Sequence, residues 1–205
     1  MSADANGRWS YSRYEQVLQT QASLRARRQA RDVADRARSG FGARQGRQRL
    51  DAGLQVADSL DALPHPWRTI HRLDADTGTR LAAIAIGPGG VFSVTTLAAD
   101  APTTVHDRAI VIDDRATDVV NQARRAADLT GRRLTRALGR AIPVTPTVAV
   151  VGTVPDHVGA PRAMVVTDVE ALGTALRTHA PPRYDTAAIA EIVRAATSPA
   201  MWALH

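Results

Sequence analysis

The sequence predicts an α/β domain in which helices flank a central mixed sheet, preceded by an N-terminal helical arm. Three observations lead to this fold class. Short apolar runs at residues 81–86 and 145–152 lie between turn residues, which is typical of strands covered on both faces. Residues 115–139 carry apolar side chains at three- and four-residue spacing, as in an amphipathic helix. Strand and helix patterns also alternate along the chain in an order that favours packed layers.

The N-terminal arm is assigned to residues 1–41 and contains an arginine-rich helix predicted over residues 11–38. This helix has no proline or glycine and is rich in Ala, Arg, Gln and Leu, which are good helix formers. Its apolar residues thin out after Leu24, so its second half has little to bury. We therefore expect the arm to project or to dock loosely, and we expect the glycines of residues 39–42 to end it.

The α/β domain is assigned to residues 42–205. A tight turn is predicted at Gly87-Pro88-Gly89-Gly90, because proline fixes φ and glycine permits positive φ. The capping box Thr167-x-x-Glu170 predicts the start of a helix. In chain order we expect a helix over 43–62, strands over 67–73, 81–86, 91–97 and 109–112, the helix over 115–139, strands over 145–152 and 163–166, and helices over 167–179 and 185–197.

Composition excludes several classes of protein. Apolar residues make up 44% of 205 residues, within the globular range. No apolar run approaches the roughly 20 residues that span a bilayer, and residues 1–10 lack a signal-peptide core. Cysteine is absent, which excludes disulfides, thiolate metal ligands and a cysteine nucleophile. We expect a cytoplasmic protein without membrane contact.

The basic charge is carried by arginine alone and is concentrated in one segment. All 26 basic residues are arginine, so lysine-dependent chemistry is excluded. Residues 25–49 hold nine arginines against Asp32 and Asp35, whereas the whole chain is only +6. Such one-sided charge attracts phosphate backbones, although a solvated helix face is the alternative. The candidate nucleic-acid-binding residues are Arg25, Arg27, Arg28, Arg31, Arg44, Arg47 and Arg49.

An ordered set of short motifs resembles the nuclease-related domain (NERD) family, a branch of the PD-(D/E)xK, restriction-endonuclease-like fold. The set begins with Gly46 on the first helix of the domain. It continues with Trp67-Arg68-Thr69-Ile70-His71, Ile86-Gly87-Pro88-Gly89-Gly90-Val91-Phe92, Pro143-Val144-Thr145-Pro146-Thr147-Val148 and Ala195-Ala196-Thr197-Ser198-Pro199-Ala200-Met201-Trp202. The resemblance runs from about residue 42 to the C-terminus, and it implies a restriction-endonuclease-like layered domain.

The resemblance also implies a metal-dependent nuclease site, whose residues this chain lacks. The family pattern has a Gly-Glu pair on the first helix, Ile-Asp-His before the Gly-Pro-Gly turn and an acidic-or-polar-x-Lys stretch after it. Carboxylates bind Mg²⁺, the metal makes hydroxide available and stabilises phosphate charge, and the lysine steadies that charge. Here Arg47, Ala82, Thr95 and Leu97 occupy the glutamate, aspartate, polar and lysine positions.

These replacements predict a catalytically inactive domain without catalytic residues, metal or cofactor. Alanine offers no lone pair to a metal, and arginine repels a dication. The leading hypothesis is a binding or scaffold module, and its most specific version is a module that binds DNA or RNA through the basic arm. Trp9, Tyr11 and Tyr14 beside the arm are candidates for stacking on bases, or for anchoring the helix to its own domain.

Two other functions stay open at this point. The helix over residues 11–38 would pair with a protein partner if the chain were an interaction or oligomerisation module. A metal-dependent nuclease with migrated carboxylates is the other alternative. Its candidates all lie in predicted turns or strand ends, where exposed aspartate is ordinary: Asp74, Asp76, Asp113 and Asp114.

Overall fold

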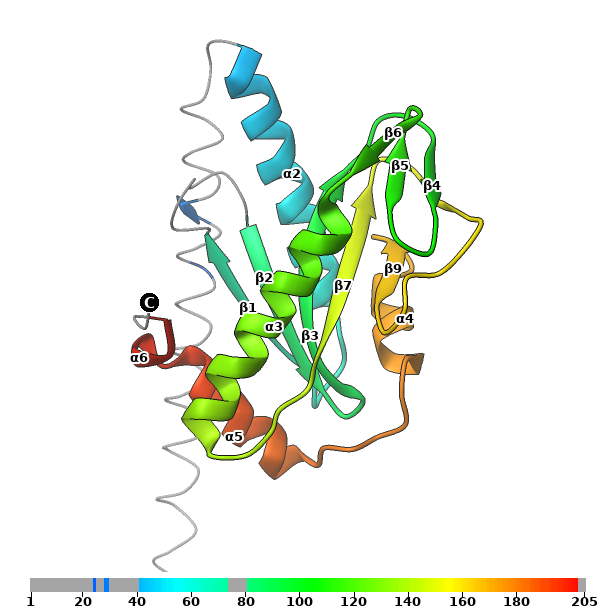
Figure 1. Ribbon diagram of the computed structural model, residues 1–205. Helices are drawn as coiled ribbons and strands as arrows, with labels where there is room; N and C mark the ends of the chain where they lie inside the picture. Colours follow the sequence, from blue (N-terminus) through cyan, green and yellow to red (C-terminus); the bar gives the residue numbers. More distant parts are fainter. Residues whose placement is uncertain (1–23, 25–27, 30–40, 74–80, 203–205) are drawn as a thin grey trace, which may run out of the picture.

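A five-stranded mixed sheet forms the centre of the described structure (Figure 1). The computed structural model describes residues 24, 28–29, 41–73 and 81–202. The sheet order is β1-β2-β3-β7-β9, with β1, β2 and β3 antiparallel and β7 and β9 parallel to β3. The strands are β1 (Arg68–Leu73), β2 (Leu81–Gly87), β3 (Gly90–Ala98), β7 (Val144–Val151) and β9 (Val165–Asp168). The predicted layered α/β fold with a mixed sheet is confirmed.

Helices cover both faces of this sheet. They are α2 (Phe41–Asp61), α3 (Val119–Leu138), α4 (Leu172–Thr178), α5 (Thr186–Thr197) and α6 (Pro199–Trp202). Buried side chains of α2 and α4 pack on one face, and those of α3, α5 and α6 pack on the other. No helix within the described part of the chain is both long and apolar enough to cross a membrane.

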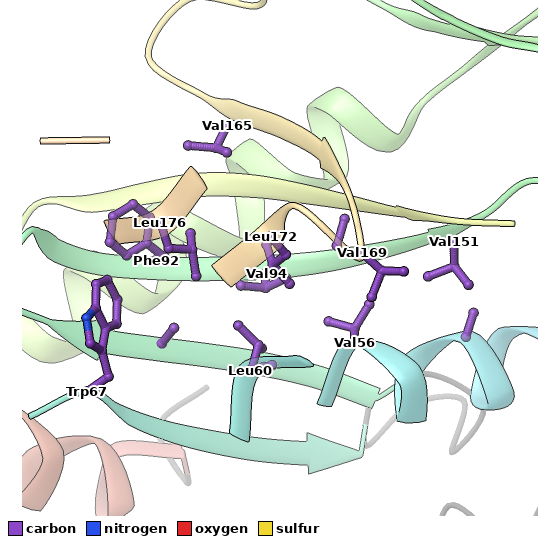
Figure 2. Close-up of a cluster of buried hydrophobic side chains, with 14 residues drawn as sticks. Val56, Leu60, Trp67, Phe92, Val94, Val151, Val165, Val169, Leu172 and Leu176 are labelled. Atoms are coloured by element: carbon purple, nitrogen blue, oxygen red, sulfur yellow. The ribbon is translucent and has the colours of Figure 1, made fainter. Parts of the chain in front are cut away.

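The core on the α2 face is built around aromatic side chains (Figure 2). Trp67 and Phe92 lie with ring centroids 5.8 Å apart, and Leu60 of α2 and Leu176 of α4 belong to the same cluster. On β2, Ala83 and Ala85 belong to this cluster, whereas Ile84 and Ile86 belong to the cluster on the opposite face. The apolar run of β2 therefore arises because both faces of the strand are covered, as predicted.

The glycine-rich turn between β2 and β3 is shaped by what packs against it. A Cβ on Gly87 would lie 2.2 Å from the Trp67 ring. The indole ring therefore fits in its observed position only because residue 87 has no side chain. The Pro88 carbonyl accepts hydrogen bonds from the backbone N–H groups of Arg183 and Tyr184 at 2.8 and 3.1 Å. The turn thus holds both β1 and the segment before α5, which is an architectural role.

A second, four-stranded sheet was not predicted. Its order is β6-β5-β4-β8, from β6 (Arg115–Thr117), β5 (Ile110–Ile112), β4 (Thr103–Val105) and β8 (Asp156–His157). Only the β5 strand was expected. Strands of two or three residues are too short to display an alternating pattern, so the sequence carried little signal for this sheet.

Two predicted helix starts are wrong. The helix predicted over residues 115–139 begins at Val119, because Arg115–Thr117 pairs with β5 across a two-residue turn. The capping box at Thr167 does not form: Thr167 is buried in β9, and α4 begins only at Leu172. Asp168 Oδ1 instead accepts the Ala171 backbone N–H at 2.7 Å.

The predicted N-terminal arm lies almost wholly outside the described residues. Apart from Phe41, only Leu24, Arg28 and Gln29 of it are described, and these three are helical and exposed. Phe41 and Gly42, where a break was expected, already belong to α2. The proposed partner-binding helix over residues 11–38 is therefore not tested.

Candidate functional site

The four positions that the family resemblance assigns to nuclease chemistry lie on α2, β2 and β3. Arg47 is in the first half of α2, and Ala82 is near the start of β2, opposite Arg72 of β1. Thr95 and Leu97 lie toward the end of β3, in the half of the strand that is remote from the glycine-rich turn. The antiparallel course of β2 and β3 brings the start of one near the end of the other.

The sheet separates Arg47 from Leu97. Leu97 packs against the cluster that includes Val119 of α3 and Val150 of β7. Thr95 is two residues away on the same strand, so it shares this face, and it is only 8% exposed. Arg47 and Ala98 line a cavity on the opposite face, which α2 covers. The Thr95 and Leu97 side chains therefore do not meet Arg47 in one open site.

The cavity beside Arg47 has a volume of about 680 Å³ and lies at the carboxyl ends of β3 and β7. Ligands of α/β sheets commonly bind outside the carboxyl ends of parallel strands. Its polar groups are Arg47, Gln48, Asp51, Gln55 and Asp100. Gln48 Nε2 donates to Asp100 Oδ2, which occupies one carboxylate oxygen. Because the cavity holds one cation and two carboxylates, it has no net positive charge that would attract a polyanion.

Carboxylates do not gather into a metal-binding set within the described ranges. No group of three or more His, Cys, Asp or Glu residues there could hold a metal ion. Asp113 and Asp114 form the turn between β5 and β6 with φ of 47° and 60°, a conformation that aspartate tolerates in two-residue hairpins. Asp74 and Asp76 lie outside the described residues.

His71, which the family motif includes, takes part in a buried polar contact. Its side chain is fully buried, and Nε2–H donates to Asp61 Oδ1 at 2.8 Å. Thr69 Oγ1 donates to the same carboxylate oxygen at 2.6 Å, whereas His71 Nδ1 has no hydrogen-bond partner. The contact links β1 to the end of α2. Because the imidazole is closed off from solvent, this arrangement fits structure better than acid–base catalysis.

The predicted nucleic-acid-binding arginines are only partly described. Arg25, Arg27 and Arg31 lie outside the described residues, and Arg28 is exposed on a helical turn. Arg44 belongs to α2, Arg47 is half-buried at its cavity, and Arg49 is exposed. Because neighbours two apart on a helix point to different sides, Arg47 and Arg49 do not form one patch.

A basic surface on α3 was missed by the sequence reasoning. Arg125, Arg132 and Arg136 are all exposed and recur at spacings of seven and four residues, which place them on the outer side of the helix. We call these three residues the α3 arginine ridge. The apolar stripe of the same helix dominates its sequence pattern, although the arginine spacing is also visible there.

Two arginines, one from β1 and one from the C-terminal half of α3, contact the ring of Trp202. The guanidinium groups of Arg72 and Arg133 lie 4.4 and 5.3 Å from the ring centroid of Trp202. Trp202 Nε1 donates to the Ala196 carbonyl at 2.8 Å. Desolvation, and secondly the Arg133 charge, lowers the pKa of Arg72. This contact joins β1, α3 and α6.

No protein-family model, curated protein or solved structure matches this chain.

Proposed function

We propose that this chain is a nucleic-acid-binding domain with a nuclease-related layout that does not cleave its ligand. The single observation that carries the binding part is the α3 arginine ridge. Arg125 and Arg136 are eleven residues apart, which corresponds to about 16 Å along a helix axis. Duplex DNA presents roughly ten phosphates over that length. The ridge therefore offers an array of cations of suitable length for a phosphate backbone.

The ridge arginines are little neutralised by the domain itself. Among the described residues the one ion pair on the ridge joins Arg132 to Asp128 at 2.9 Å, and both side chains are more than 60% exposed. An exposed i,i+4 pair of this kind contributes only about 0.3–0.5 kcal/mol. It can therefore open at little cost when a phosphate approaches. Arg47 and Arg49 belong to α2, which packs on the opposite face of the sheet from α3, so they do not extend the ridge.

The expectation of no cleavage is supported by the surroundings of β3. The positions that the resemblance assigns to a metal ligand and a lysine are the buried Thr95 and the packed Leu97. Neither side chain carries a charge that could bind a metal or stabilise a phosphorane-like transition state. Substrate bound on the ridge would thus meet no hydrolytic machinery of the family type.

Fluorescence anisotropy with a labelled duplex tests binding by the ridge. We expect the affinity to fall steeply with salt, because each neutralised phosphate releases counterions. A variant with Arg125→Ala, Arg132→Ala and Arg136→Ala should bind at least about tenfold more weakly and show a shallower salt slope.

The control variant changes three arginines that lie outside α3: Arg115→Ala, Arg177→Ala and Arg183→Ala. It has the same net charge as the ridge variant, so it separates local contact from general attraction. Equal weakening in both variants would contradict binding by the ridge, and so would the absence of any duplex binding at low salt.

A further inference from the structure

A second cavity lies where the small sheet meets the first turns of α3. Its volume is about 790 Å³, and it is more enclosed than the cavity beside Arg47. Three arginines from three separate segments line it: Arg108 from the β4–β5 turn, Arg124 from α3 and Arg162 from the segment between β8 and β9. The other lining residues are Asp107, Asn121 and Ala160.

The two loops that carry Arg108 and Arg162 are bound to each other by backbone hydrogen bonds. The Val105 carbonyl accepts from the N–H groups of Val158 and Gly159 at 3.1 and 3.0 Å. The Ala160 N–H donates to Asp107 Oδ1 at 3.2 Å. A Cβ on Gly159 would lie 2.6 Å from that same oxygen, so glycine is needed for the close approach. The cavity wall is therefore fixed before any ligand arrives.

The third arginine is positioned by the core beneath the small sheet. Ala123 of α3 is buried in one cluster with Val105 and Ile110 of the small sheet. This packing fixes the rotation of α3, and Arg124 follows Ala123 directly along the chain. Asn121, one helical turn earlier, donates through Nδ2 to Asp118 Oδ1 at 2.8 Å, which holds its amide at the rim.

The charges in this cavity are unbalanced. Three arginines stand against Asp107, which gives a formal charge of +2, and Asp107 already accepts the Ala160 N–H. Within the described ranges no ion pair engages Arg108, Arg124 or Arg162. Guanidinium groups bind phosphate oxygens through paired N–H donors, and a bound dianion would offset the positive charge of the three arginines that line the cavity.

We propose that this cavity is a phosphate-binding site formed by Arg108, Arg124 and Arg162. Its size falls within the roughly 300–1,000 Å³ of small-molecule sites, so it has room for more than a single phosphate. The phosphate could be carried by a free phosphorylated compound or by the end of a nucleic-acid strand. The chemistry of recognition is shared by both sources, and the site does not depend on duplex binding by the α3 arginine ridge.

Isothermal titration calorimetry of the full chain at low salt, with pyrophosphate as the probe, tests this site. Arg124→Ala should weaken pyrophosphate binding about tenfold or more, because it removes hydrogen bonds from a charged donor. Arg177→Ala is the control: it lies in α4, is exposed, removes the same charge, and belongs neither to the cavity nor to the α3 arginine ridge. Both substitutions place alanine in an exposed helical position, so the fold should be kept.

A second titration identifies the source of the phosphate. Single-stranded oligonucleotides with and without a 5′-phosphate are compared in the wild-type chain and in both variants. Preference for the phosphorylated strand that is lost in Arg124→Ala supports a nucleic-acid end, whereas an Arg124-dependent response to pyrophosphate alone supports a free compound. The proposal is overturned if neither probe binds, or if Arg124→Ala and Arg177→Ala weaken binding equally. Failure of the ridge variant to alter duplex binding would leave this result untouched.

Discussion

Replacing Gly87 by alanine should destabilise the domain severely through one steric contact. The added Cβ would lie 2.2, 2.4 and 2.5 Å from Cδ2, Cε3 and Cε2 of Trp67. Carbon atoms in van der Waals contact lie about 3.5–4.0 Å apart, so the ring would have to retreat by more than about 1 Å. Trp67 is only 7% exposed and packs against Phe92, which leaves little space for such a movement.

We expect a loss of about 3 kcal/mol, at the upper end of the range for overpacked cores. For a chain of this length that corresponds to a fall in Tm of roughly 6–12 °C. Urea and thermal denaturation, followed by circular dichroism and tryptophan fluorescence, measure it. Gly139→Ala is the control, because its φ is 68° with no atom within 4 Å of the added Cβ. It should cost only about 1–2 kcal/mol, from backbone conformation alone.

A double-mutant cycle with Trp67→Leu separates the clash from other effects. Each single substitution should destabilise the domain, but the double variant should be more stable than the sum of the two losses predicts. The smaller side chain removes the atoms that the new Cβ would meet, so the two sites must couple. A Gly87→Ala protein that unfolds within about 0.5 kcal/mol of the wild type, or strictly additive losses, would refute the reasoning.

Three further predictions follow from the described contacts. Asp61→Ala removes the acceptor of the buried His71 imidazole and should lower the free energy of unfolding by about 1–3 kcal/mol in urea denaturation. An unchanged midpoint would contradict this contact. Trp202→Ala removes a hydrogen bond and two cation–π contacts and should cost about 2–4 kcal/mol; a Tm equal to that of the wild type would disprove it. Thr95→Asp with Leu97→Lys should lower Tm without producing Mg²⁺-dependent cleavage of plasmid, because both positions face the packed side of the sheet. New cleavage activity would show that they face an open site.

The central sheet could be predicted because its strands carry strong local signals. β2 is apolar on both faces, and the turn after it combines proline with three glycines. The end of α3 was also clear, since Gly139 adopts the left-handed conformation common after helices. These features depend on residues that are close together in the sequence, which is why local patterns revealed them.

Other features depend on contacts between distant segments. Arg115–Thr117 has acceptable helix formers, yet its pairing with β5 turns it into a strand. Thr167 has the spacing of a capping box, but burial in β9 prevails over the local preference. The cavity lined by Arg108, Arg124 and Arg162 joins three segments whose arginines have no shared spacing. The family resemblance assigned Arg47 and Leu97 to one site, but it could not show that the sheet separates them.

The central claim is that this domain binds nucleic acid without cleaving it. One electrophoretic measurement tests both parts: plasmid DNA is incubated with the full chain at low salt in the presence of Mg²⁺ or Mn²⁺ and run before and after removal of the protein. We expect retarded DNA in the samples that are run with the protein, and intact supercoiled plasmid in the samples from which the protein has been removed. Nicked or linear plasmid, or unretarded DNA at every protein concentration, would contradict it.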